Sequence, residues 1–158
     1  MNSIEQEKLP VMISVRGEQY FDDVDPNATE LMTEGTLEQT EDGFLLSYQE
    51  TELTGMEGTL TTFRIAPDRI TLLREGTINS EMIFEEGQKH FSLYETPFGG
   101  LMLGVNTHRA KARIGEGGGS LSIRYALEAD SQLIGENAFE SQVTEPTLDQ
   151  RAPLDQAL

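Results

Sequence analysis

Hydrophobic and polar residues alternate with a period of two along most of the chain. The clearest example is residues 121–127, in which Leu121, Ile123, Tyr125 and Leu127 share one face. The same alternation recurs in other segments, namely 11–15, 31–37, 101–105 and 110–114. Because successive side chains of a β-strand point to opposite faces, this period predicts half-buried strands. We find no convincing 3.6-residue apolar period, as an amphipathic helix would show, over ten or more residues.

Residues that favour turns separate these runs at short intervals. Glycine or proline occurs in each of the following segments: 41–43, 67–69, 86–88, 97–100 and 115–119. Such spacing is typical of hairpin connections. Runs and turns together predict roughly ten antiparallel strands, as in an all-β barrel or sandwich.

A chain of 158 residues fits a single domain. We expect a polar N-terminal lead-in at residues 1–8, a β-barrel domain at 9–143 and a flexible C-terminal tail at 144–158. The tail contains two prolines and isolated aliphatic residues without a strand pattern. Packing of this tail on a partner is the alternative.

Acidic residues dominate the charge. The sequence has 28 acidic and 11 basic residues, for a formal net charge of −17. Such a field repels phosphate backbones and anionic lipids, so we expect no nucleic-acid or membrane partner. Without cysteine there is no disulfide, thiol nucleophile or cysteine metal site. The sequence lacks both a signal-peptide pattern and the ~18 consecutive apolar residues of a membrane span, which predicts a cytoplasmic protein.

Three segments carry a family resemblance: residues 46–65, 74–107 and 125–139. Their most specific parts are Tyr48 with Glu50, the turn at 54–58, Arg74 with Gly76, and residues 94–99. In these parts the chain resembles the YwiB-like family, a bacterial domain of unknown function placed among the lipocalin-like calycins. The likeness extends over residues 10–143. It implies a single closed antiparallel barrel of about eight to ten strands, and it implies no reaction and no catalytic residues.

Charged residues share the inner face of the predicted barrel with apolar ones. If Leu46 and Tyr48 point inward, the alternation also turns Glu50 and Glu52 inward, unless a bulge near Gly55 changes the register. By the same argument Ile70 and Leu72 bring Arg74 inside.

An unpaired charge in such an interior costs several kcal/mol, so Glu50 and Arg74 need partners. We expect them to pair with each other, or one of them to hold a polar ligand. The alternative is a charge pair near the barrel mouth that only fixes the strand register.

A polar row follows on a later strand, where His90, Ser92, Tyr94 and Thr96 share one face. If this face points inward, it offers a ligand several hydrogen-bonding groups. One of them is an imidazole, a side chain that ordinarily titrates near neutral pH. If it points outward, it is an ordinary solvated surface.

No catalytic motif stands out. Neither Ser80 nor Ser92 lies in a glycine-flanked nucleophile elbow. Glu50 with Glu52 or Glu57 could be proposed as the carboxylate pair of a glycosidase. In a chain with 28 acidic residues, however, neighbouring carboxylates arise by chance, so this pair is weak evidence for such an enzyme.

Two loops resemble ligand-binding motifs only in part. Residues 23–34 match a calcium loop at four positions, but Ala28 replaces the required glycine, so we expect an ordinary acidic loop. The run Gly115–Gly119 lacks the lysine of a phosphate-binding loop, and we expect a hairpin tip. We therefore predict no cofactor and no metal.

A single basic cluster is predicted on one outward face, formed by Arg109, Lys111 and Arg113 with Arg124 nearby. We interpret it as a solvated stripe balanced by neighbouring acids; a site for an anion or an acidic partner is the alternative.

We predict that the protein is a non-catalytic barrel that binds a small molecule. The predicted polar lining consists of Tyr48, Glu50, Arg74, His90 and Tyr94. The alternative is a protein-interaction or structural module with a filled barrel and an acidic exterior. A third, weaker hypothesis is an enzyme that uses Glu50 and His90 for proton transfer.

Overall fold

The computed structural model describes residues 8–20 and 27–146, and these residues form ten β-strands. The strands are β1 (Lys8–Tyr20), β2 (Asn27–Gln39), β3 (Phe44–Gln49), β4 (Thr59–Ala66), β5 (Arg69–Gly76), β6 (Ser80–Phe84), β7 (Lys89–Thr96), β8 (Gly99–Gly115), β9 (Gly118–Ala129) and β10 (Gln132–Thr144). In this part of the chain no helix is long and apolar enough to span a membrane.

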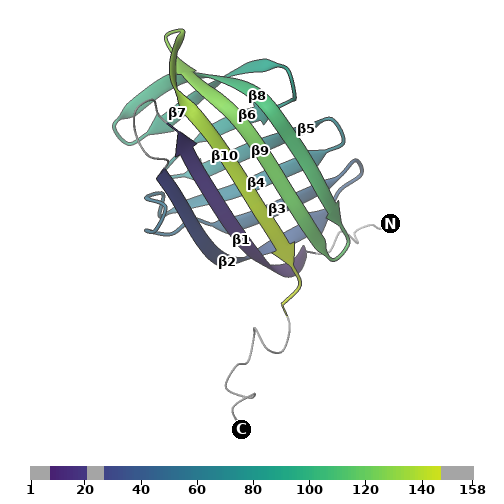
Figure 1. Cartoon of the computed structure of the whole chain (residues 1–158). Helices are drawn as coiled ribbons and strands as arrows, with labels where there is room; N and C mark the ends of the chain where they lie inside the picture. The colour runs from purple at the N-terminus through teal and green to yellow at the C-terminus, as the bar shows by residue number, and fades with distance from the viewer. Residues whose placement is uncertain (1–7, 21–26, 147–158) are drawn as a thin grey trace.

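All ten strands belong to one antiparallel sheet in the order β6-β5-β4-β3-β2-β1-β10-β9-β8-β7. Consecutive strands other than β6 and β7 pair as hairpins along the sheet, and β1 also pairs with β10. The sheet curls until its two edges, β6 and β7, lie next to each other (Figure 1). The predicted all-β, lipocalin-like antiparallel barrel is therefore confirmed, with edges that almost close.

The curled sheet places β3 to β6 behind β1, β8, β9 and β10, with the core between the two halves (Figure 1). Aromatic pairs link the halves across this core. The rings of Phe63 on β4 and Phe139 on β10 lie 5.0 Å apart, and those of Phe84 on β6 and Tyr125 on β9 lie 4.8 Å apart. Buried aliphatic residues fill the remaining core, among them Val11, Ile13, Leu46, Leu72, Val105, Leu121 and Ile123.

The two alternating segments 101–105 and 110–114 belong to one strand, β8, which contains a bulge between them. The register with β9 shifts between Thr107 and Arg109. Before the shift odd-numbered residues are buried, such as Val105, and after it even-numbered ones such as Ala112 pack on the core. Because the bulge adds one residue to the strand, a single strand carries both patterns.

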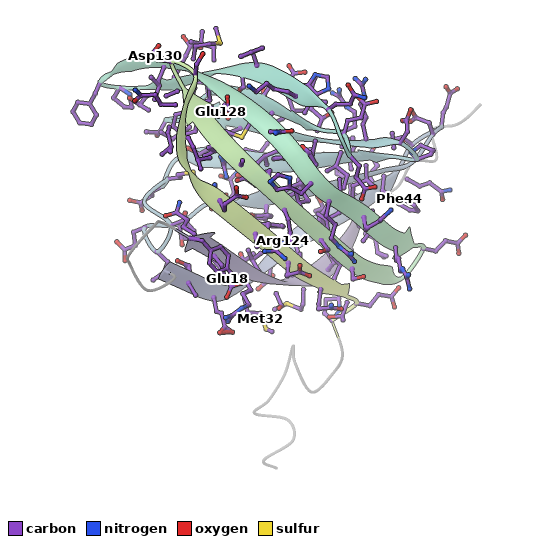
Figure 2. The ribbon with its side chains drawn as sticks, turned by 45° about the horizontal axis from the view of Figure 1, so that its top comes forward. Glu18, Met32, Phe44, Arg124, Glu128 and Asp130 are labelled. Atoms are coloured by element: carbon purple, nitrogen blue, oxygen red, sulfur yellow. The ribbon has the colours of Figure 1, made fainter. Side chains whose placement is uncertain are left out.

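We name the two ends of the barrel after Asp130 and Phe44, which are labelled in Figure 2. The Asp130 end contains the turns at 50–58, 77–79, 97–98 and 130–131, and the Phe44 end contains the turns at 40–43, 67–68, 85–88 and 116–117. The glycine run at 115–119 forms the β8–β9 hairpin tip at the Phe44 end, as predicted.

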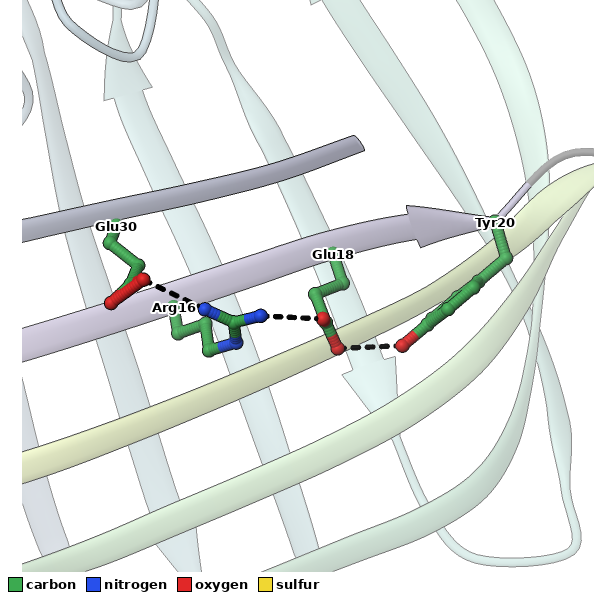
Figure 3. Close-up of polar contacts among 4 residues, drawn as sticks. All are labelled: Arg16, Glu18, Tyr20 and Glu30. Atoms are coloured by element: carbon green, nitrogen blue, oxygen red, sulfur yellow. Dashed lines mark hydrogen bonds and ion pairs between the residues drawn. The ribbon is translucent and has the colours of Figure 1, made fainter. Parts of the chain in front are cut away.

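Ion pairs cover part of the outer face. Arg16 on β1 contacts Glu30 on β2 and Glu18 on its own strand, both at 2.8 Å, and the Tyr20 hydroxyl donates to Glu18 at 2.6 Å (Figure 3). The hydrogen bonds from Tyr20 and Arg16 lower the pKa of the Glu18 carboxyl. This exterior carries charge in the usual way for a solvated sheet face.

Candidate functional site

A row of polar side chains crosses four strands on the inner face of the barrel, near the Asp130 end. Tyr48 on β3 is the register partner of Thr61 on β4, Thr61 is the partner of Arg74 on β5, and Arg74 is the partner of Ser80 on β6. Since register partners lie side by side on the same face of a sheet, these four side chains are immediate neighbours. We call them the polar row.

Glu50 lies beside the polar row, where β3 ends. Its side chain is buried, with 6% of the residue exposed. The two carboxylate oxygens accept hydrogen bonds from the hydroxyls of Thr54, at 2.9 Å, and Thr61, at 2.5 Å. These hydroxyls stabilise the buried carboxylate without a cation.

Glu50 and Arg74 do not form the ion pair that the sequence led us to expect. Both carboxylate oxygens of Glu50 are engaged by threonines, and no described carboxylate pairs with Arg74. The expectation that Glu52 also points inward is wrong, since Glu52 is exposed. The chain leaves the strand at Gln49 and turns, with the Gly55 N–H donating to the Glu52 carbonyl.

Arg74 keeps part of its hydrogen-bonding capacity unused. Its Nε is buried and has no hydrogen-bond partner. Its positive charge reaches Tyr48 and Tyr125, where it opposes the rise of the phenol pKa. The residue as a whole is half-buried, so the unfavourable feature is this one N–H, which is removed from water without an acceptor.

The tyrosines around Arg74 remain protonated at neutral pH. Burial is the main cause that raises the pKa of Tyr48, and the neighbouring Glu50 carboxylate raises it further. Burial likewise raises the pKa of Tyr125, and Tyr94 adds to this effect. Tyr94 and Tyr125 both pack against the barrel core, and the protonated hydroxyls of Tyr48 and Tyr125 can donate hydrogen bonds.

Four buried hydroxyls in the barrel also lack a partner. They belong to Ser80 on β6, Ser92 on β7, Thr107 on β8 and Ser141 on β10. In folded proteins the large majority of buried polar atoms are hydrogen-bonded. With Arg74 Nε, the described interior thus contains five polar atoms that are able to bind something else.

His90 lies apart from this group. It is the second residue of β7, at the Phe44 end, and its Nε2 is 3.0 Å from Glu85 Oε1. The same oxygen of Glu85 is 3.3 Å from Arg69. His90 therefore belongs to a polar cluster at the β6–β7 turn, whereas Tyr94 lies four residues farther along the strand, towards the Asp130 end.

Sequence reasoning missed Thr61, Ser80, Thr107 and Tyr125 as interior polar groups. Each lies on the buried face of a strand whose alternation the sequence displays. The available signal was the position of each residue in the two-residue period, which places hydroxyl residues on an otherwise apolar face.

The predicted basic cluster lies on the outer face, where Arg109, Lys111, Arg113 and Arg124 border a shallow groove. Arg124 is labelled on this face in Figure 2. Lys111 pairs with Glu86 at 3.2 Å, and Arg109 donates to Ser122, whose hydroxyl donates to Glu140. Carboxylates are thus interspersed among the cations of this groove.

Metal-ligating groups are sparse in the part of the chain that the structure describes. There, no three histidine, aspartate or glutamate side chains gather in a way that could hold a metal ion. Residues 23–26 of the calcium-loop-like segment lie outside the described residues, and residues 27–34 of it belong to β2.

Comparison with known proteins gives a family and a fold. Residues 13–140 match the family model described as domain of unknown function DUF1934. Among solved structures, the ywiB protein from Bacillus subtilis superposes with a TM-score of 0.74 at 18% identity, over 89% of this chain and 94% of that one. A likeness at this identity concerns the fold alone. The search of curated proteins found no match.

Proposed function

Since the chain belongs to the DUF1934 family, whose description assigns no activity, we propose a function from the interior of its barrel: it binds a small organic anion without transforming it. The predicted resemblance to the YwiB-like family is confirmed. The family match spans most of the described barrel and leaves the ligand to be argued from the site.

The observation that carries this proposal is the unpartnered Nε of Arg74 inside the barrel. A carboxylate, sulfonate or phosphate would supply a charged acceptor for this N–H. Hydrogen bonds between a guanidinium and such an anion are charge-assisted and therefore stronger than neutral ones. Arg74 is thus the group that we expect to select the charge of the ligand.

Neutral donors around Arg74 support the same ligand class. The phenols of Tyr48 and Tyr125 stay protonated, and Ser80 and Ser92 have free hydroxyls. Glu50 accepts the hydroxyls of Thr54 and Thr61 and also interacts with the Tyr48 phenol, so Ser80 and Ser92 are the buried hydroxyls without a partner among the described residues of this region. A ligand rich in acceptor oxygens would satisfy these groups.

The geometry favours binding over catalysis. Glu50 contacts Thr54 and Thr61, while His90 contacts Glu85 near the opposite end of the barrel. A general acid and a general base need to reach the same reacting group. The separation of these two residues therefore gives no support to the proton-transfer hypothesis.

The alternative of a filled barrel that acts only as an interaction module is less well supported. The core is packed with aromatic and aliphatic side chains, as this alternative requires, but such a core usually satisfies its own polar atoms, whereas five remain without a partner among the described residues. The acidic exterior stays available to a protein partner in either case.

We place this binding function in the bacterial cytoplasm, without nucleic-acid or membrane partners. The net charge of −17 opposes association with polyanions. The bacterial setting follows the family resemblance.

The proposal is tested with 8-anilinonaphthalene-1-sulfonate, an anion whose fluorescence rises in an apolar environment. Losing a hydrogen bond to a charged group costs about 1.5–3 kcal/mol, so Arg74→Gln should raise the Kd about tenfold to a hundredfold. The matched control is Arg64→Gln, which removes one cation from the exposed face of β4. Glu50→Gln removes a nearby negative charge and should lower the Kd.

Equal affinity of Arg74→Gln and Arg64→Gln would contradict the proposal, provided that urea unfolding shows both variants folded. Native mass spectrometry of the protein purified from its own host gives independent support if it detects a retained anion.

A further inference from the structure

The two edges of the sheet leave an opening in the barrel wall. At the Asp130 end β6 and β7 are joined through Asn79 and Glu95, whose backbones exchange hydrogen bonds of 2.8 and 3.0 Å. At the Phe44 end the wall is closed by hydrogen bonds of Thr107 with Gly87 and Gln88. Between these two points β6 and β7 form no ladder. We call this opening the seam.

A hollow of about 430 Å³ lies along the seam. Ile83, Phe91 and Leu93 border it from the outer face, and Ser80 and Ser92 from the inner face. Since residues of both faces line it, the hollow lies between the two strand edges; Arg74 is not among its lining residues. Ser80 and Ser92 are small and buried, and their hydroxyls lack partners.

The inner side of the seam adjoins the proposed anion site. Ser80 is the register partner of Arg74, so the two side chains are neighbours on the inner face. A molecule whose acidic group contacts Arg74 therefore has the seam beside it.

The outer side of the seam is apolar at its centre and acidic at its rim. Phe91 is 69% exposed and Leu93 is 47% exposed, although both side chains are hydrophobic. Glu81 and Glu95 stand beside them. The two carboxylates repel an anionic group, and the exposed parts of Phe91 and Leu93 can contact a hydrocarbon; the Lys89 ammonium lies 5.9 Å from the centre of the Phe91 ring.

From this arrangement we infer that the ligand is an amphipathic organic acid bound head first. Its acidic group contacts Arg74, and its apolar chain or ring passes Ser80 and Ser92 and lies against Phe91 and Leu93 in the seam. The inference rests on the proposed anion site and adds the apolar part and the orientation of the ligand.

A homologous series of straight-chain carboxylates, from butanoate to decanoate, tests the inference by titration calorimetry. Burial of one methylene stabilises by about 0.8 kcal/mol, so each added methylene that enters the seam should tighten binding about threefold to fourfold. The double variant Phe91→Gln/Leu93→Gln should remove most of this increment from the longer acids and leave the shorter ones unchanged.

A matched control removes two exposed apolar side chains elsewhere on the surface. Met32 on β2 and Leu133 on β10 are 64% and 58% exposed. Met32→Gln/Leu133→Gln should preserve the increment per methylene. Because all four substituted residues are exposed, their replacement leaves the core intact, and urea unfolding verifies this.

The outcomes separate the two proposals. Binding that depends on Arg74 but not on chain length overturns the inference and leaves the anion site standing. A chain-length increment that survives Phe91→Gln/Leu93→Gln overturns the seam as the apolar site. Failure of every acid and of the fluorescent sulfonate to bind overturns both.

Discussion

Tyr48 combines burial with two opposing charges, and it reports on the polar row directly. Burial and the Glu50 carboxylate raise the pKa of its phenol, while Arg74 acts in the other direction. A phenol whose pKa is higher in the folded than in the unfolded protein keeps its proton after the unfolded chain has lost it. Folding then weakens as the pH rises above the ordinary tyrosine pKa of about 10.

This predicts that Tyr48→Phe reduces the alkaline loss of stability. The contribution of Tyr48 is fully present below pH ~10 and declines as the pH rises towards the folded-state pKa. The free energy of unfolding, measured in urea at pH 8 and pH 10.5, should fall less in the variant than in the wild type. An equal fall in both proteins would mean that Tyr48 is not buried beside Glu50.

At the residue scale, alternation placed Glu50 and Arg74 on the inner face and left open which way the face of Tyr94 points, and it did not predict which groups these residues contact. One of the two threonine partners of Glu50 is Thr61, eleven residues later on the neighbouring strand. This contact depends on the register between β3 and β4 and on where β3 ends. His90 shares its strand face with Tyr94, yet its position next to the β6–β7 turn gives it Glu85 as a neighbour. A two-residue period carries no information on position along the barrel axis.

At the element scale, the position of β2 against β3 requires a residue without a side chain at Gly35. A Cβ at this position would lie 2.3 Å from the Ser47 carbonyl oxygen and 2.5 Å from Ile13 Cδ1. The last register pair between β2 and β3 is Thr36 with Ser47. Gly35 directly precedes Thr36 in β2, and Tyr48 directly follows Ser47 in β3. The close approach of these strands therefore positions the first residue of the polar row.

We predict that Gly35→Ala destabilises the protein by about 1–3 kcal/mol, the usual range for overpacking of a core. Gly17→Ala is the matched control, since nothing lies within 4 Å of a Cβ placed on Gly17 in β1. Urea unfolding of both variants measures the difference. Comparable stabilities would show that β2 and β3 are farther apart than described.

The elements themselves were predictable where alternation was regular and turns contained glycine or proline. The β9–β10 turn was not recognised, because it consists of Asp130 and Ser131. Both residues have positive φ, 52° and 65°, as two-residue hairpin turns require. The bulge after Thr107 also escaped detection, since one extra residue exchanges the two faces of a strand without any change in composition.

At the scale of the whole molecule, closure of the barrel was implied by the family resemblance and could not be predicted from the alternation of residues. Closure depends on how far the sheet curls and on two short contacts between distant segments, Asn79 with Glu95 and Thr107 with residues 87–88. These contacts leave the seam open between them. The negative charge, in contrast, follows from composition alone.

The net charge of −17 predicts that salt stabilises the protein. Repulsion among the excess carboxylates acts over the Debye length, which falls from about 30 Å at 0.01 M to about 8 Å at 0.15 M ionic strength. The urea midpoint should therefore rise between these concentrations of sodium chloride. A falling midpoint would mean that surface ion pairs such as Arg16–Glu30 outweigh the repulsion.

The central claim, that Arg74 receives an anion inside the barrel, is tested most directly by a crystal structure with 4-bromobenzoate. Anomalous scattering from the bromine locates the molecule and its orientation. We predict a carboxylate within about 3 Å of the Arg74 guanidinium, the distance of a charge-assisted hydrogen bond, with the bromine towards the seam. Bromine only on the outer face, for instance in the groove around Arg109 and Arg124, would contradict the account.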